Sequence, residues 1–292
     1  MTTTTTTTCN IRGMDCHVNQ WNVDTSKNPP KALIVIFHGF LAHGNYPTVR
    51  YAAEFLAKEG DYAVISIDFP GHGKSPGDRG FIESAEILIQ DGKTMVEYAM
   101  GLFTDSKPKL FLVGSSMGGA IALSVAQIMD KKDAAISGVV LLAPMLQLNV
   151  NSIERFALMG LSCVVPTMAL IPSSATDSAK QYRDDVKRKE CDDDPLTVSG
   201  AKLKVASALA CVDIATNIQK EFPKIETPYL IMVADEDVVV KNAGSEKLFN
   251  QTPDTTDKTK KHYPALHGLL CEPKPLFDEI QKDMLDWIAA RV

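Results

Sequence analysis

The chain has 292 residues, 45% of them hydrophobic and 23% charged, which is the composition of an ordinary soluble globular protein. Its net charge of −6 at pH 7, with no basic stripe, argues against nucleic acid as a partner. The six cysteines include no C-x-x-C pair, so a structural zinc site and a disulfide framework both lack support. We therefore expect reduced thiols and a cytoplasmic protein.

The N-terminal segment is a run of seven threonines with no apolar core of the kind found in secretory signals. Its low complexity predicts a disordered Thr-rich tail over residues 1–9. The next segment, NIRGMDCHVNQW over 10–21, predicts a hairpin that turns at Arg12-Gly13.

From residue 31 onward, β-branched runs alternate with helical patterns. The run KALIVIF over 31–37 is typical of a strand buried on both faces. The pattern then predicts helices over about 47–59, 83–103 and 275–290, and strands over 62–68, 110–114, 138–144 and 228–234. This alternation predicts an α/β fold with a mostly parallel central sheet and helices on both of its faces.

The alternation lapses between about residues 146 and 223, where a helix over about 200–220 is the one clear element. We expect residues 10–146 and 223–292 to form the core and residues 147–222 to form a helical cap, or lid, over the carboxyl ends of the strands. The segment FALMGLSCVVPTMALIP over 156–172 is the most apolar stretch outside the sheet, but it is too short for a transmembrane helix. It is either a cap helix buried against its neighbours or a lid with an exposed apolar face.

The segment LFLVGSSMGGA over 110–120 predicts a strand, a sharp turn with Ser116 at its tip, and a helix. Such a turn lifts a serine hydroxyl clear of the sheet, where a base can reach it. Glycines belong at 114 and 118 because strand and helix approach closely on either side of the serine. Ser116 is therefore the candidate nucleophile.

A nucleophilic serine needs a base, and the base needs an orienting acid. On a sheet of this kind the acid should follow a late strand and the histidine should come last. His267 in YPALHG is the candidate base, with His262 as its nearby rival. For the acid, sequence position favours Asp237, but Asp235 lies in the same loop and stays open.

The oxyanion that develops during acyl transfer needs preorganised N–H donors. The helix that begins after Ser116 offers the N–H of Met117, and the turn after the first long strand offers that of Phe40. His38 in the same turn is expected to be structural. The loop Gly71-His72-Gly73 does not follow G-x-G-x-x-G, so we expect it to shape the floor of the site and not to hold a phosphate.

Several ordered motifs accompany these residues: N-x-R-G-x(7)-W at 10–21, H-G-F at 38–40, D-F-P-G-H-G-K-S-P-G-D-R-G-F-I at 68–82, G-x-S-M-G-G at 114–119, L-L-A-P-M at 141–145, D-P-L at 194–196 and H-x-L-x-x-E-P at 267–273. With these motifs the chain resembles the monoacylglycerol lipase and lysophospholipase family of α/β-hydrolases, and most closely its plant-type branch. The resemblance covers nearly the whole chain, and in it the catalytic acid aligns with Asp237. Ser115 departs from the family, which often has His or Glu there.

The resemblance implies a serine hydrolase that cleaves monoacylglycerols to free fatty acid and glycerol through an acyl-enzyme, without a metal or a cofactor. The implied partner is a lipid ester substrate, and the cap is expected to touch a membrane or lipid droplet peripherally. The alternatives are a lysophospholipase, another carboxylesterase such as one for hydroxycinnamoyl esters, or a non-catalytic ligand-binding member of the fold. Retention of all three triad residue types disfavours the last of these.

Overall fold

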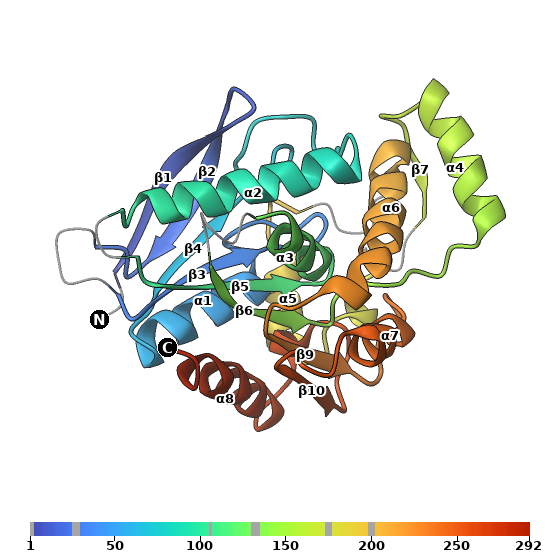
Figure 1. The fold of residues 1–292 in the computed structure, drawn as a ribbon. Coiled ribbons are helices and arrows are strands. Elements are labelled where there is room, and N and C mark those ends of the chain that lie inside the picture. The colour runs from blue at the N-terminus through green and yellow to red at the C-terminus, as the bar shows by residue number, and fades with distance from the viewer. Residues whose placement is uncertain (1–2, 25–29, 105–106, 130–134, 173–176, 198–201) are drawn as a thin grey trace.

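The computed structural model describes residues 3–24, 30–104, 107–129, 135–172, 177–197 and 202–292 (Figure 1). Its centre is an eight-stranded sheet with the strand order β1-β2-β4-β3-β5-β6-β9-β10. The strands are β1 Thr4–Ile11, β2 Met14–Trp21, β3 Ala32–Phe37, β4 Ala63–Ile67, β5 Lys109–Ser115, β6 Ile136–Leu142, β9 Tyr229–Ala234 and β10 Lys258–Tyr263. Strands β1 and β2 run antiparallel to their neighbours, and all the others pair in parallel.

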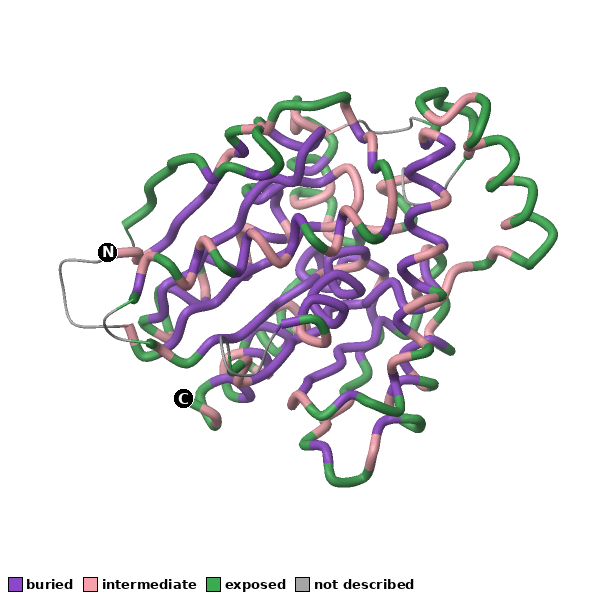
Figure 2. Tube along the Cα trace, turned by 45° about the horizontal axis from the view of Figure 1, so that its top comes forward, coloured by how far each residue is buried: buried purple, intermediate pink, exposed green. Residues whose placement is uncertain are grey.

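The central strands are buried over most of their length, as their uninterrupted apolar runs predict. Every residue of β3, β4 and β9 is buried, and Figure 2 shows the strands as the buried middle of the molecule. Parallel pairing brings the carboxyl ends of β3, β5 and β9 to one edge of the sheet. The predicted α/β fold with a mostly parallel sheet is confirmed.

Helices cover both faces of this sheet (Figure 1). On one face, α1 Pro47–Glu59 and α8 Leu276–Ala289 pack against one hydrophobic cluster. On the other face, α2 Ala85–Gly101, α3 Met117–Ile128 and α7 Ala243–Gln251 contribute to a second cluster. The two clusters place the sheet in the middle of a three-layer core.

The prediction of a disordered tail over 1–9 is wrong for the residues that the structure describes. Residues from Thr4 onward form β1, which pairs in full register with β2, from Thr4 opposite Trp21 to Ile11 opposite Met14. Threonine is β-branched and favours extended backbone, and ladder hydrogen bonds need no apolar side chain. The predicted hairpin turn at Arg12-Gly13 is present, with φ of 51° and 80°.

Between β6 and β9 the chain leaves the central sheet. This stretch contains α4 Ser152–Val164, β7 Ala169–Ile171, η2 Ser178–Lys180, α5 Asp185–Asp192, β8 Leu203–Lys204, α6 Val205–Glu221 and η3 Phe222–Lys224. Strands β7 and β8 form a separate two-stranded sheet. Helix α6 packs on α3, and α4 packs on the outer side of α6 (Figure 1). The division of the chain into core and cap stays a prediction.

Helix α4 carries most of the apolar segment noted in the sequence. Asn151 caps its first turn, with Glu154 completing a capping box, and the helix ends two residues before Pro166. The helix has no buried residue, so a cap helix buried against its neighbours is the wrong alternative. Its large apolar side chains are exposed instead, with Ile153 82% and Phe156 74% accessible. In the described ranges no helix combines the length and apolarity needed to cross a membrane.

Candidate active site

The turn between β5 and α3 holds Ser116 in an unusual backbone conformation, with φ 54° and ψ −119°. Two backbone hydrogen bonds to the turn after β6 keep it there. The Ser116 N–H donates to the Leu142 carbonyl at 3.0 Å, and the Met145 N–H donates to the Ser116 carbonyl at 2.9 Å. A positive φ is rare for a residue with a Cβ and is typical of strained functional turns.

The glycines around Ser116 are required by space. A Cβ on Gly114 would lie 2.1 Å from the Gly118 carbonyl oxygen, and a Cβ on Gly118 would lie 2.1 Å from that of Phe37. Backbone atoms therefore leave no room for any side chain at either position. This close approach sets the start of α3 directly against the ends of β3 and β5.

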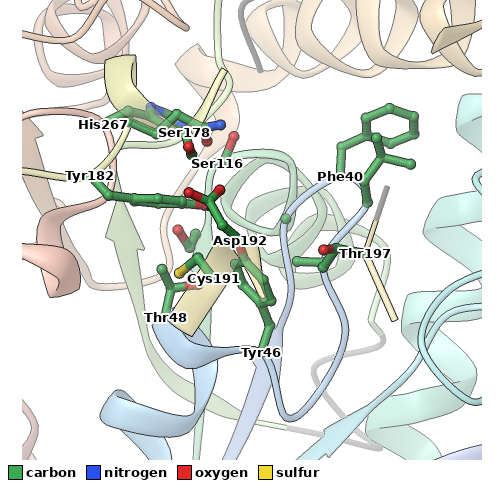
Figure 3. A pocket seen from close by; sticks show the side chains of 16 residues that line it. Phe40, Tyr46, Thr48, Ser116, Ser178, Tyr182, Cys191, Asp192, Thr197 and His267 are labelled. Carbon is green, nitrogen blue, oxygen red and sulfur yellow. The ribbon is translucent and has the colours of Figure 1, made fainter. Parts of the chain in front are cut away.

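His267 lies beside Ser116 at the carboxyl edge of the sheet (Figure 3). Its Nδ1 is 2.6 Å from Oδ2 of Asp237, whose side chain is fully buried. The other carboxylate oxygen of Asp237 accepts the N–H groups of Val239 and Val240 at 2.7 and 3.0 Å. A carboxylate held on both oxygens fixes the imidazole, which leaves Nε2 as the ring nitrogen available to a partner.

The rival residues form a separate pair at the surface. His262 Nδ1 is 2.7 Å from Oδ1 of Asp235, and both side chains are nearly half exposed. Neither residue lines the pocket that contains Ser116. The geometry thus groups Asp237 with His267 and Asp235 with His262.

The turn after β3 brings a second backbone segment to Ser116. A Cβ on Gly39 would be only 3.6 Å from Cβ of Ser116, so the chain passes the serine at van der Waals distance. The turn is closed by the Ala42 N–H, which donates to the Gly39 carbonyl at 3.2 Å, and Leu41 has a positive φ of 59°. Phe40 and Met117 therefore stand in backbone segments on the two sides of Ser116.

His38 and His72 support this turn from below. The His38 Nδ1–H donates to the Gly39 carbonyl at 2.8 Å, and its Nε2 accepts the Phe69 N–H at 3.1 Å. The His72 ring is 5.3 Å from that of His38 and 5.9 Å from that of Phe40. Burial lowers the pKa of His38 well below its ordinary value and that of His72 to about 4, so both rings stay neutral. The loop at 71–73 thus contacts the Phe40 turn through His72, but none of its residues lines the pocket that contains Ser116, so its role as the floor of the site stays a prediction.

A pocket of about 720 Å³, its open mouth included, surrounds Ser116 (Figure 3). The lining also includes Tyr46, Tyr182, Cys191 and Asp192, which lie across the pocket from Phe40, and Thr197, which lies nearer to Phe40. The hydroxyls of Tyr46 and Tyr182 are 3.2 Å apart, and burial raises the pKa of both, so they remain protonated hydrogen-bonding groups.

Cys271, close to His267 in the sequence, packs behind the pocket wall with its Sγ 4.0 Å from that of Cys191. Burial raises the pKa of the Cys271 thiol well above its ordinary value, so it stays protonated. This placement fits a packing role for Cys271.

A residue from the segment between β6 and β9 makes ion pairs that fix the positions of the loops that carry Asp237 and His267. Arg183 pairs with Glu236 at 2.9 Å and with the buried Glu272 at 2.9 Å. Glu272 in turn accepts the Leu266 N–H at 2.6 Å. Arg183 therefore links the acid loop and the histidine loop through one guanidinium.

A second link runs from His43, next to the Phe40 turn, to Asp194, at 2.8 Å. The D-P-L motif marks Asp194, but no role for it follows from the sequence.

No sequence signal could have identified four further residues, because their positions depend on contacts between distant segments: Arg183, Tyr46, Tyr182 and Asp192. Within the described part of the chain, no three His, Cys, Asp or Glu side chains are grouped closely enough to hold a metal ion.

Known proteins resemble this chain over most of its length. A protein-family profile described as serine aminopeptidase, S33, matches residues 28–274. Mouse monoglyceride lipase is 28% identical over 268 residues, which cover 90% of this chain and 84% of the mouse protein. A putative monoglyceride lipase of Schizosaccharomyces pombe is 30% identical over 284 residues, which cover 94% of this chain and 71% of that protein.

Solved structures share the same fold. A soluble variant of monoglyceride lipase from Saccharomyces cerevisiae, in complex with a substrate analog, has a TM-score of 0.81 at 22% identity, covering 98% of this chain and 96% of that one. At this identity the likeness concerns the fold, and it confirms the predicted α/β-hydrolase fold.

Proposed function

Since the chain belongs to the serine aminopeptidase, S33, family of hydrolases and has monoglyceride lipases among its relatives, we propose that it cleaves the ester bond of monoacylglycerols to release a fatty acid and glycerol. The chain is a carboxylic ester hydrolase of this family. The observation that carries the proposal is the buried 2.6 Å contact between Asp237 and His267, set beside Ser116 in the pocket.

In the proposed reaction, His267 Nε2 removes the proton of the Ser116 hydroxyl while Oγ attacks the ester carbonyl carbon. The N–H groups of Met117 and Phe40 donate to the negatively charged oxygen that develops. Asp237 stabilises the imidazolium and keeps its ring orientation. Collapse of the intermediate breaks the ester bond, and the imidazolium gives its proton to the departing glycerol oxygen.

The acyl-enzyme is then hydrolysed by the same groups. His267 takes a proton from water, the resulting oxygen attacks the acyl carbonyl, and Ser116 is released with its proton restored. The two sides of the pocket suit the two products. The wall with the hydroxyls of Tyr46 and Tyr182 fits the glycerol part, whereas Phe40 and Leu41 offer apolar contact to the acyl part.

We further propose that α4 rests on a lipid surface and brings the pocket to its substrate. The helix is attached through Arg155, whose guanidinium pairs with Asp213 of α6 at 2.7 Å. The exposed apolar residues on and after α4 are Ile153, Phe156, Met159, Leu161, Val164, Met168 and Leu170. A polar attachment beneath an apolar outer face is the arrangement of helices that lie in a membrane interface. The free cysteines support a cytoplasmic location for this contact.

The direct test replaces the nucleophile. Ser116→Ala should lower hydrolysis of a monoacylglycerol by about 10⁴-fold or more and abolish labelling by a fluorophosphonate probe. Ser124→Ala, a buried serine of α3 outside the pocket, is the matched control and should keep both signals. Circular dichroism and thermal melting check that both variants fold. Full activity in folded Ser116→Ala would refute the assignment.

A substrate panel separates the remaining alternatives. It should contain monoacylglycerols, lysophospholipids, hydroxycinnamoyl esters and aminoacyl p-nitroanilides, the last because the family description names an aminopeptidase. We expect the highest kcat/KM for monoacylglycerols. Turnover confined to another class would move the function to that class, and no turnover or labelling would favour a ligand-binding protein.

A further inference from the structure

Three consecutive carboxylates end helix α5, and their surroundings differ. Asp193 pairs with Lys189 at 2.8 Å, and Asp194 pairs with His43 at 2.8 Å. Among the described residues, Asp192 has neither an ion pair nor a side-chain hydrogen bond. Its side chain points into the pocket toward Ser116 (Figure 3). Asp193 and Asp194 thus each have a direct partner, whereas Asp192, which faces the active site, interacts with Lys189 only through its longer-range charge.

The rest of the pocket wall does not compensate this charge. Asp192 is the single carboxylate among the described residues that line the pocket, and no lysine or arginine lies among them. Its neighbours in the pocket are Tyr46 and Tyr182, whose hydroxyls are 3.2 Å apart. The part of the pocket that we assign to the alcohol product is therefore negatively charged and rich in hydroxyls.

We propose that Asp192 determines specificity for the alcohol part of the ester, favouring an uncharged polyol and disfavouring a phosphate-bearing one. The inference rests on the proposed esterase function and goes further by choosing between the two substrate classes of the family. A glycerol hydroxyl can donate a hydrogen bond to the carboxylate, whereas a phosphate placed there meets like-charge repulsion. Selection by repulsion is a common means of specificity.

The test compares two monomeric esters that differ only in a phosphate on the alcohol part: 1-hexanoylglycerol and 1-hexanoylglycerol 3-phosphate, both below the concentration at which they aggregate. The short chain removes any effect of a lipid surface. For the wild type we expect kcat/KM to favour the neutral ester by about tenfold or more, with the difference mainly in KM. Asp192→Asn should reduce this preference at least about threefold, and Asp193→Asn should leave it unchanged.

Salt supplies a second readout that needs no variant. Because Asp192 is exposed to the pocket, raising the salt from about 0.05 M to about 0.5 M should shrink the wild-type preference. The same change should have little effect on Asp192→Asn. A merely structural role for Asp192 would alter both esters together and would not depend on salt.

The inference would be overturned by an Asp192→Asn preference equal to that of the wild type, or by a wild-type preference that salt does not change. A protein that hydrolyses the phosphate ester faster than the neutral one would overturn it as well. Failure of the proposed function looks different, because then neither ester would be turned over and the fluorophosphonate probe would not label Ser116.

Discussion

The side chains of Asp237 and His267 are buried, and hydrogen bonds hold the loops that carry them and Ser116, whereas α4, between β6 and β9, has no buried residue at all. Around Ser116, backbone atoms approach so closely that even a methyl group does not fit. Around α4, a glycine such as Gly160 has nothing within 4 Å of the place where a Cβ would stand. The first region sets the positions of reacting groups to fractions of an ångström, and the second leaves its surface available to a lipid phase.

This difference predicts where substitutions act. Substitutions at the catalytic edge should lower kcat for every substrate, and those in its packed turns should also lower the stability of the fold. Changes in the segment between β6 and β9 should alter which substrate is used, or from which surface it is taken. The segment between β6 and β9 contacts the pocket or its loops through Asp192, Arg183 and Asp194.

The largest effect is expected at the buried acid. Asp237→Asn should lower kcat/KM by about 10³ to 10⁴-fold, because an amide favours the wrong imidazole tautomer and cannot balance its charge. Asp235→Asn removes the equivalent charge from the exposed pair with His262 and should change kcat/KM less than about twofold. Steady-state kinetics on a water-soluble ester measure both. Equal losses in the two variants would contradict the grouping of Asp237 with His267.

Alanine at two glycines compares the packing of the regions directly. Gly118→Ala places a Cβ 2.1 Å from the Phe37 carbonyl oxygen and should cost about 3 kcal/mol or more of unfolding free energy. Gly160 lies in the middle of α4 with free space around it, so Gly160→Ala should instead raise the unfolding free energy by up to about 1 kcal/mol through helix propensity. Urea unfolding gives both values. A Gly118→Ala protein as stable as the wild type would show that the turn is less constrained than described.

Acid should weaken the catalytic edge through its buried histidines. His72 has a pKa of about 4 when folded, below that of an unfolded histidine at about 6.5. Above pH 6.5 His72 is neutral in both the folded and the unfolded state, so it does not reduce the unfolding free energy. Between about 6.5 and 4 only the unfolded state binds the proton, so His72 removes about 1.4 kcal/mol of stability per pH unit.

The measurement is the unfolding free energy at several pH values in wild type and His72→Asn. An asparagine does not titrate, so the variant should lose less stability than the wild type over the same interval. Other titrating groups act in both proteins and cancel in the difference. Parallel pH profiles would refute the link to His72.

The smallest effect on chemistry is expected from α4. Replacing Ile153 and Phe156 together by serine should lower hydrolysis of vesicle-bound monoacylglycerol about three- to tenfold relative to the rate on a water-soluble ester. Vesicle co-sedimentation should fall in parallel, because less apolar surface is buried in the lipid. An unchanged ratio of vesicle to soluble rates would exclude α4 as the contact surface.

The sequence was most informative where burial dictates residue type. Strand β3 and the turn at Ser116 follow from uninterrupted apolar runs and from glycines that no other residue can replace. Helix α1 begins and ends where the pattern predicts, because Pro47 marks its first turn and Gly60 its end. The candidate triad could be proposed for a related reason, since chain order and loop position restrict it strongly.

Strands at the edges of the sheet could not be predicted from hydrophobic periodicity. Strand β10, KTKKHY, is stabilised by pairing with β9 and carries lysines that suit an exposed edge, so no apolar alternation announces it. The threonines of β1 likewise show no apolar alternation, so the sequence predicted a disordered tail where the structure has a strand. Pocket residues such as Tyr46, Tyr182 and Asp192 could not be predicted, because they meet only once distant segments fold together.

The backbone conformation of Ser116 has a consequence for how this chain evolves. A residue with a Cβ at φ 54° and ψ −119° costs on the order of 1–3 kcal/mol, and glycine would adopt the same angles with less strain. Selection for folding stability alone would therefore replace the serine with glycine. A lineage that no longer needed the hydroxyl would have a stabilising substitution within reach. Serine at position 116 would therefore be maintained by selection for activity, although glycine would give a more stable fold.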